Sequence, residues 1–247
     1  MTLAELWDIC IRFMWDEEYI LGLDSFLKSR KVKTILDCAG GTGFPAIALK
    51  KHGWDVTYSD GSKEMFDFFE EELKKENFQI PHYLLNWLEL SKKFSHKFDA
   101  VLCRGNSLIY VDSWDGNLIQ EQTKENIKNS LREFFSVLNP NGLLYLDIIN
   151  KKEFDKLSYP IVEEFGEKII DGKKIKLTWE LMHDYENRKR TWKSILMIDG
   201  VCHEFSYFSY LLRHEELVKM MNEAGFKKVE PVEIKGEKNY NVFVGTK

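Results

Sequence analysis

The sequence has little cysteine and no paired cysteine motif. Its four cysteines, Cys10, Cys38, Cys103 and Cys202, lie far apart, and no two of them form a C-x-x-C pair. We therefore expect neither disulfides nor a cysteine zinc site, and reduced thiols fit a cytoplasmic protein. None of the six histidines has ligand spacing to another histidine or to a cysteine, so no metal site is expected.

The chain also lacks a basic block and a long apolar stretch. Its 35 Lys and Arg residues are interspersed with 40 Asp and Glu residues, which gives a net charge of −5. This charge distribution provides no basic surface that would bind a phosphate backbone, so nucleic acid is not an expected partner. No apolar stretch approaches the length of about 20 residues that a membrane helix needs, and the N-terminus does not have the pattern of a signal peptide. We therefore expect no membrane partner.

The hydrophobic pattern predicts an α/β fold. Apolar residues at helical spacing over residues 3–30 indicate one or two helices, and short apolar strands then alternate with helices. This alternation is typical of a doubly wound, mostly parallel sheet with right-handed crossovers. A helix at 121–138 should end at the Asn139-Pro140-Asn141-Gly142 turn. The seven predicted strands are 34–37, 54–59, near 83–85, 98–103, 143–149, and an antiparallel pair at 228–234 and 239–245.

A second pattern begins after this core. Runs with β-branched and aromatic residues at 174–182, 191–198 and 202–210 are separated by turn signals, which predicts antiparallel hairpins. We interpret them as a cap over the cofactor site, and its aromatic residues could form a cation cage or simply pack. A chain of 247 residues fits one domain. Its predicted parts are N-terminal helices (1–33), a cofactor-binding core (34–150), an antiparallel β cap insertion (151–212), and a final helix with two strands (213–247).

The most informative segment follows the first predicted strand. That strand ends in Asp37, and the turn Cys38-Ala39-Gly40-Gly41-Thr42-Gly43 lets the backbone approach a ligand closely, as at a nucleotide-binding site. Asp60 ends the second strand about 20 residues later, where a carboxylate can accept hydrogen bonds from both ribose hydroxyls. Residues 41–46 also satisfy the G-x-G-x-x-A fingerprint, so a dinucleotide-dependent dehydrogenase remains an alternative.

The turn resembles motif I of the class I S-adenosylmethionine-dependent methyltransferases. The acid directly before it and the Asn-Pro-Asn-Gly turn before the fifth strand are also typical of them. Residues 86–90, 98–107 and 146–150 are similar to segments of the glycine N-methyltransferase and glycine/sarcosine N-methyltransferase family. This resemblance, over about residues 15–155, implies S-adenosylmethionine as the cofactor. It implies methyl transfer to the nitrogen of a small amine or amino acid, and it leaves homo-oligomerisation open.

The resemblance also implies how the methyl donor is bound. Ala39 and its glycines would lie beside the methionine part, Asp60 on the ribose, and Asn86 and Trp87 around the adenine. The alternative for Trp87 is a core position under a loop. Arg12 could reach the donor's carboxylate from the N-terminal helix. The expected donor-binding residues are Arg12, Asp37, Ala39, Gly40, Gly41, Gly43, Asp60, Gly61, Asn86, Trp87, Cys103 and Arg104.

The expected catalytic residues are Tyr19 and Asn106, and the expected acceptor-binding residues are Asn106, Tyr110, His203 and Tyr240. Asn106 and Tyr110 follow the fourth strand, at the sheet edge where ligands bind. Tyr19 and Tyr240 correspond to family tyrosines near the active site.

The sequence departs from the family at two places. His203 stands where the family has an arginine clamp for the acceptor's carboxylate; Arg188, Arg190 and Arg213 are other candidate clamps. Arg104 replaces an apolar residue, and it could bind an anion, stack on the adenine or point to solvent.

Other functions would use the same residues to bind the methyl donor. A small-molecule O- or C-methyltransferase would differ only in the cap, and a non-catalytic donor-binding scaffold would keep the same glycine turn. A nucleic-acid adenine methyltransferase is disfavoured, because residues 104–107 do not match the Asn/Asp-Pro-Pro-aromatic turn that such enzymes use.

Overall fold

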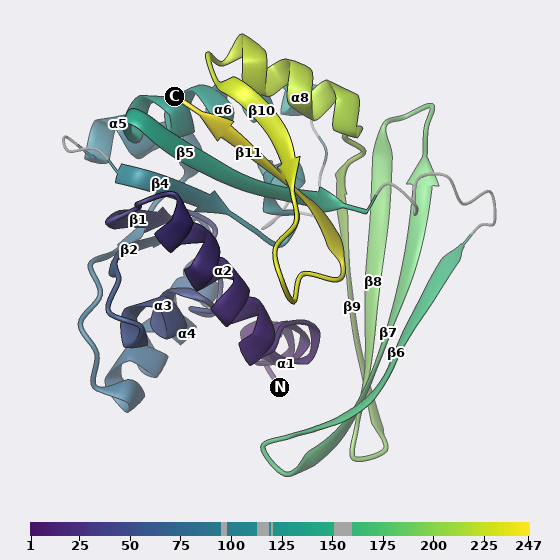
Figure 1. Ribbon diagram of the computed structural model, residues 1–247. Coiled ribbons are helices and arrows are strands. Elements are labelled where there is room, and N and C mark those ends of the chain that lie inside the picture. Colours follow the sequence, from purple (N-terminus) through teal and green to yellow (C-terminus); the bar gives the residue numbers. More distant parts are fainter. Residues whose placement is uncertain (95–97, 113–118, 120, 151–159) are drawn as a thin grey trace.

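The computed structural model describes residues 1–94, 98–112, 119, 121–150 and 160–247. These residues form a seven-stranded sheet in the order β10-β11-β5-β4-β1-β2-β3 and a four-stranded sheet in the order β6-β7-β8-β9. Figure 1 shows the first sheet flanked by helices and the second standing beside it. The strands of the first sheet are β1 (Thr34–Asp37), β2 (Asp55–Asp60), β3 (His82–Leu84), β4 (Phe98–Cys103), β5 (Leu138–Ile149), β10 (Lys227–Val232) and β11 (Tyr240–Thr246).

The first sheet is doubly wound around β1. Strand β1 pairs in parallel with β2 and with β4, and β3 and β5 extend the sheet in parallel on either side. Only β11 runs against its neighbours, β5 and β10. The predicted fold class is thereby confirmed. The sheet grows in opposite directions from its centre, because β2 and β3 lie on one side of β1 whereas β4 and β5 lie on the other. The carboxyl ends of the two strands at such a switch point form a crevice where ligands bind.

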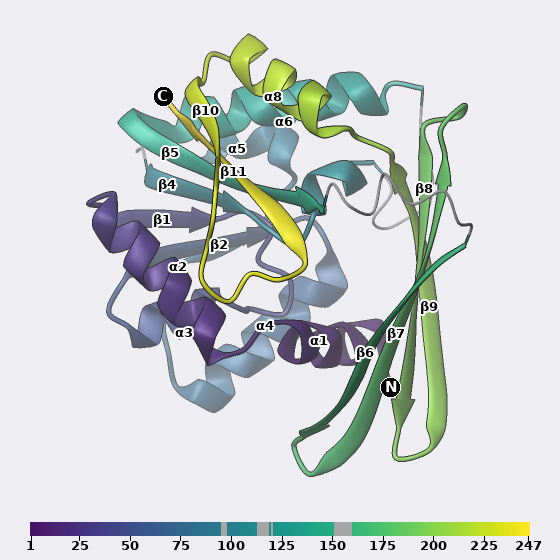
Figure 2. The same ribbon diagram turned by 45° about the vertical axis from the view of Figure 1, so that its right-hand side comes forward.

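Helices cover both faces of this sheet. Helices α5, α6 and α8 lie along its upper side in Figures 1 and 2, and α2, α3 and α4 lie on the opposite side. Helix α4 begins after Ser62, whose hydroxyl caps it by accepting the Met65 N–H at 3.5 Å. The helices are α1 (Leu3–Met14), α2 (Glu17–Ser29), α3 (Ala46–Lys51), α4 (Lys63–Glu76), α5 (Leu90–Lys93), α6 (Thr123–Val137) and α8 (His214–Glu223), with 3-10 turns η1 (Trp87–Glu89) and η2 (Ser107–Tyr110).

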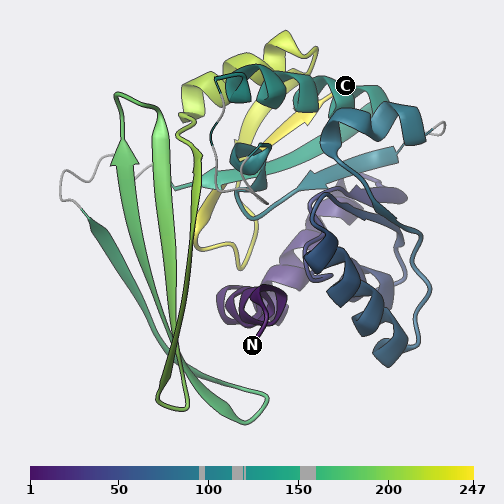
Figure 3. The same ribbon diagram turned by 180° about the vertical axis from the view of Figure 1, so that it is seen from behind.

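The cap is an antiparallel sheet of β6 (Ile161–Ile170), β7 (Lys173–Asp184), β8 (Lys189–Ile198) and β9 (Val201–Tyr210). Helix α1 contacts both β6 of the cap and α4 of the core (Figure 3). Trp7 of α1 meets Trp192 of β8 edge to face at 5.4 Å between ring centroids, and Trp192 meets Trp179 at the same distance. These cap aromatics therefore pack against one another and against α1.

Two boundaries differ from the sequence prediction. Strand β5 starts at Leu138 and includes the Asn-Pro-Asn-Gly turn, which bulges out of the sheet: Phe98 pairs with Leu138, but Ala100 pairs with Leu143. Strand β6 lies outside the predicted hairpins, because most of its residues are exposed and its apolar alternation is weak. Residues 151–159, part of the expected cap insertion, fall outside the described residues. None of the described helices is long and apolar enough to cross a membrane.

Candidate functional site

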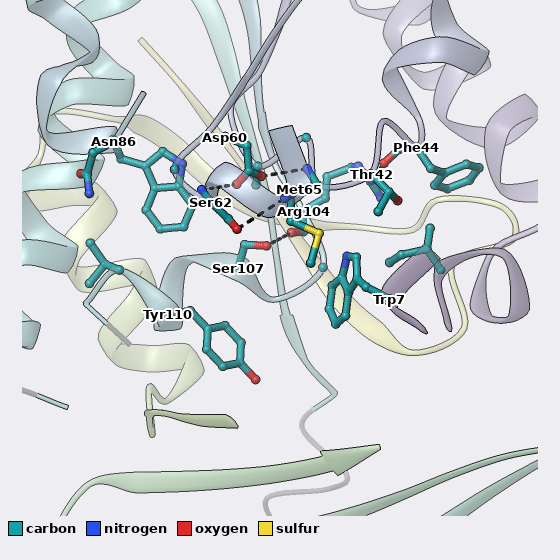
Figure 4. A pocket seen from close by; sticks show the side chains of 18 of the residues that line it. Trp7, Thr42, Phe44, Asp60, Ser62, Met65, Asn86, Arg104, Ser107 and Tyr110 are labelled. Atoms are coloured by element: carbon teal, nitrogen blue, oxygen red, sulfur yellow. Dashed lines mark hydrogen bonds between the residues drawn. The ribbon is translucent and has the colours of Figure 1, made fainter. Parts of the chain in front are cut away.

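A cavity of about 330 Å³ opens at the carboxyl ends of β1, β2 and β4. Its volume is in the range of small-ligand and cofactor sites. Figure 4 shows side chains from the turn after β1, the end of β2, the loop after β4 and helix α1 converging on it. Nine of the predicted site residues line this cavity: Ala39, Gly40, Gly41, Asp60, Gly61, Asn86, Trp87, Arg104 and Tyr110.

The glycine turn is fitted tightly to the end of β2. A Cβ atom on Gly40 would lie 2.1 Å from the Tyr58 ring, so only glycine fits there without a shift. The Tyr58 hydroxyl donates to the Gly41 carbonyl at 2.6 Å, and Asp60 accepts the Gly41 N–H at 2.8 Å. Asp60 also accepts the Ser62 N–H at 2.8 Å. These bonds fix the orientation of the Asp60 carboxylate at the cavity wall.

Trp87 and Asn86 form another wall of the cavity. The Trp87 indole donates its N–H to the Cys38 carbonyl, and its ring meets Phe134 edge to face at 6.0 Å. Trp87 therefore lines the cavity and also packs against α6. Asn86 is exposed at the rim, where its side-chain oxygen accepts the Leu88 N–H at 2.9 Å.

Arg104 brings a positive charge to the cavity. The side chain is 4% exposed, and its guanidinium lies between 5.3 and 5.7 Å from the ring centroids of Trp15, Tyr19 and Phe44. Nη2 donates to the Phe44 carbonyl at 2.5 Å, whereas Nε has no hydrogen-bond partner in the described part of the chain. The solvent-pointing alternative for Arg104 is thus wrong. A buried cation with an unused N–H favours an anionic ligand.

The loop after β4 is held by Asp147 of β5. This carboxylate accepts the Gly105 N–H at 3.0 Å and the Asn106 N–H at 2.6 Å. Asn106 takes a left-handed backbone conformation with φ 57°, is 3% exposed, and its side-chain oxygen has no partner among the described residues. Burial and the Glu237 carboxyl raise the pKa of Asp147 to about 7, although the two backbone N–H groups oppose the shift.

The predicted tyrosines surround this loop. Tyr110 lines the cavity, and its hydroxyl accepts a hydrogen bond from Arg190 at 3.1 Å. Tyr19 is fully buried, with its hydroxyl 3.2 Å from that of Tyr145. The Tyr240 ring lies 5.8 Å from that of Trp15, a residue of the cavity wall. Tyr110 alone of the predicted tyrosines is a lining residue.

Two predicted residues lie away from the cavity. Arg12 pairs with Asp8 at 2.8 Å and with Asp171 of the cap at 2.6 Å, and it is not a lining residue. The Arg12 guanidinium therefore forms an ion pair that joins α1 to the cap. His203 lies opposite Leu196 near the β8–β9 turn and is not a lining residue either.

Three further predicted residues support the cavity from behind. Gly43 donates its N–H to the Gly40 carbonyl at 2.9 Å, and Cys103 is fully buried in β4. Asp37 is fully buried beneath the glycine turn. Burial raises the pKa of Asp37 to about 6, although the Arg104 charge opposes this shift.

Helix α1 contributes lining residues that the sequence analysis did not select. Trp7 and Ile11 lie one turn apart on α1, Trp15 directly follows the helix, and each of the three lines the cavity. The signal was present, because residues 3–30 hold more aromatic side chains than a core face requires. The remaining lining residues outside the predicted set are Thr42, Phe44, Ser62, Met65, Gly105, Ser107, Val111 and Asp112.

Known proteins resemble this chain in sequence. Residues 35–142 match a family described as "Methyltransferase domain". The glycine/sarcosine N-methyltransferase of Halorhodospira halochloris is 34% identical over 147 residues, which cover 58% of this chain and 50% of that protein. The chain spans about half the length of the first curated relatives it matches.

Solved structures share the whole architecture. The crystal structure of Streptomyces venezuelae DesVI has a TM-score of 0.77 at 18% identity, and the match covers 99% of this chain and 98% of that one. CalS10 from Micromonospora echinaspora, described as an amino pentose methyltransferase with SAM bound, has a TM-score of 0.73 at 15% identity, covering 98% and 96% of the two chains. The similarity therefore includes the cap as well as the core.

Proposed function

We propose that this chain, whose residues 35–142 match a methyltransferase domain, is a class I S-adenosylmethionine-dependent methyltransferase that transfers a methyl group to the nitrogen of a small amine or amino acid of the glycine or sarcosine type. The observation that carries the proposal is that the glycine turn, Asp60 and Tyr110 line one cavity. The names of the curated relatives support a nitrogen acceptor.

The cavity residues fit the parts of the donor. Gly40 and Gly41 line the cavity with backbone alone, against which the methionine part would lie, and Asp60 lines it as an acceptor for ribose hydroxyls. Trp87 offers an apolar face for the adenine. The unused Nε–H of Arg104 is a donor for the carboxylate of the methionine part, which makes anion binding the preferred role of this residue.

When bound, the cofactor supplies a methyl group already activated by the sulfonium, so the protein needs to add no covalent nucleophile. The chain's residues then bind and orient the acceptor, and such placement contributes several kcal/mol to the rate. The acceptor must be neutral to attack. The aromatic walls and the buried charge of Arg104 both lower the pKa of an ammonium, and they favour loss of its proton before transfer.

Calorimetry and turnover test this function. We expect S-adenosylmethionine to bind and NAD not to, and we expect S-adenosylhomocysteine to form in the presence of glycine, sarcosine or a related amine. Tight binding of NAD alone would refute the cofactor. Product formation only with hydroxyl or carbon acceptors would instead identify an O- or C-methyltransferase, and binding without product on any acceptor would favour the scaffold.

A further inference from the structure

A second buried arginine lies on the cap side of the cavity. Arg190 of β8 is 3% exposed, and its Nη1 donates to the Tyr110 hydroxyl at 3.1 Å. Its Nε has no hydrogen-bond partner among the described residues. No carboxylate of that part of the chain forms an ion pair with it either, whereas Arg188, two residues earlier, is paired with Glu216.

The surroundings of Arg190 are polar without a compensating charge. His183 is its cross-strand neighbour, and burial followed by the Arg190 charge lowers the pKa of His183 to about 4, so His183 is neutral at pH 7. Burial raises the pKa of Tyr240 well above its ordinary value, with Arg190 opposing the shift, so Tyr240 is also neutral. Asp147 and Glu237 act on Tyr240 as well, but neither forms a hydrogen bond or an ion pair with Arg190 in the described structure.

A buried guanidinium without an acid partner is costly. The penalty for removing such a charge from water is several kcal/mol, and an anion with good hydrogen-bond geometry offsets it. The planar fork of arginine suits a carboxylate, which can accept two N–H groups at once. Arg190 is therefore arranged to receive an anionic group.

Tyr110 connects this arginine to the donor cavity. Its ring lines the cavity, and its hydroxyl points away from Asp60 toward the cap strands in Figure 4, where Arg190 donates to it. Arg190 is not itself a lining residue, so an acceptor placed against Tyr110 would meet it at the hydroxyl that Arg190 bonds.

We propose that Arg190 binds the carboxylate of the methyl acceptor through Nε–H and the Nη group it shares with Tyr110, and that it selects acceptors carrying an anionic group. This inference rests on the proposed function and specifies its substrate class. It places the clamp on β8, in a residue whose guanidinium is buried beside the cavity wall, rather than at His203 on β9.

Carboxylate binding can be measured without turnover. We expect acetate and glycine to bind the full chain saturated with S-adenosylhomocysteine in calorimetry. Loss of a charge-assisted hydrogen bond predicts that Arg190→Gln weakens this binding by about 10- to 100-fold. Arg190→Lys, which keeps the charge but loses the fork, should fall between the two. Lys193→Gln is the matched control on the same strand, because Lys193 pairs with exposed Glu204, and it should bind as the wild type does.

The affinity for S-adenosylmethionine serves as the check on folding, and we expect Arg190→Gln to keep it within about twofold. If Arg190→Gln does not fold, a severalfold loss of acetate affinity in Arg190→Lys supports the proposal. Failure of acetate and glycine to bind the wild type would overturn it, as would equal binding by wild type and folded Arg190 variants.

Matched acceptors give a second readout. Glycine and glycinamide differ in the carboxylate, so we expect the wild type to prefer glycine in kcat/KM by about tenfold or more and Arg190→Gln to lose most of that preference. Differences in intrinsic amine reactivity cancel, because both enzymes face the same pair. A glycine-to-glycinamide ratio of kcat/KM that is the same in the wild type and in Arg190→Gln would refute the role of Arg190 while leaving the methyltransferase function intact. Absence of donor binding would instead refute the function itself.

Discussion

Asp60 accepts the Gly41 N–H at 2.8 Å, and this bond joins the end of β2 to the turn after β1. A carboxylate has about four lone-pair sites, so the two backbone N–H groups on Asp60 leave acceptor capacity for a sugar. The same side chain therefore shapes the turn and faces the cavity.

Replacing Asp60 should weaken the donor site. Asp60→Ala removes the acceptor for the ribose and releases the Gly41 N–H, so we expect the Kd for S-adenosylmethionine to rise by about tenfold or more. Isothermal titration calorimetry measures the change. Asp67→Ala is the control, because Asp67 pairs with Lys63 on the outside of α4. An unchanged Kd in Asp60→Ala would remove Asp60 from the donor site.

The close fit at Gly40 predicts a cost in stability. The Cβ of Gly40→Ala would overlap the Tyr58 ring, which is itself stacked on Phe69 at 3.8 Å, so neither ring can easily move. We expect a loss of about 1–3 kcal/mol in the free energy of unfolding, measured in urea. Gly61→Ala, where an added Cβ meets nothing within 4 Å, should leave stability unchanged. Equal stability of the two variants would contradict this packing.

Asn106 should affect turnover more than donor affinity. Asn106→Ala removes the buried amide oxygen but strains the left-handed backbone by about 1–2 kcal/mol, whereas Asn106→Gly removes the same atom without strain. We expect both variants to lose kcat by about tenfold or more and to keep the S-adenosylmethionine Kd within about threefold. Recovery of kcat in Asn106→Gly would show that only the backbone matters.

Asp37 predicts a pH dependence of stability. Because burial raises the pKa of Asp37 in the folded chain to about 6 from its ordinary value of 3.8, the folded chain holds a proton that the unfolded chain releases between these two values. The contribution of this group is complete below about pH 4 and is lost as the pH rises through 6. Wild type should therefore gain up to about 3 kcal/mol relative to Asp37→Asn between pH 7.5 and pH 4. A difference that does not vary with pH, measured by urea unfolding, would contradict the shift.

Local sequence patterns predicted several of the residues that line the cavity. The turn at residues 38–43 and the acid at the end of the second strand depend on short-range backbone constraints, and the parallel sheet brings them to one edge. Trp87 lines the cavity as expected, since a single strand and loop place it there. These residues lie within a few tens of positions of one another in the sequence, and the order of the strands is enough to bring them close together.

The sequence alone could not predict which arginines lie near the cavity, or that α1 lines it. Whether Arg12, Arg104 or Arg190 reaches the cavity depends on how α1 and the cap pack on the core, which no local pattern specifies. Arg12 has a partner on the cap hairpin more than 150 positions away in sequence, while Arg190 is turned inward by the alternation of β8. His203 has the right residue type for a site but lies toward the other end of its strand.

The position of α1 links ligand occupancy to the motion of the cap. Trp7 and Ile11 of this helix line the cavity together with Trp15, which follows it, and the Cys10 thiol of the helix lies 3.3 Å from the Ser194 hydroxyl of β8, so moving α1 outward disturbs both. A bound nucleoside that contacts this helix must therefore slow amide hydrogen exchange in α1 and in β8 together, although the two segments are far apart along the chain.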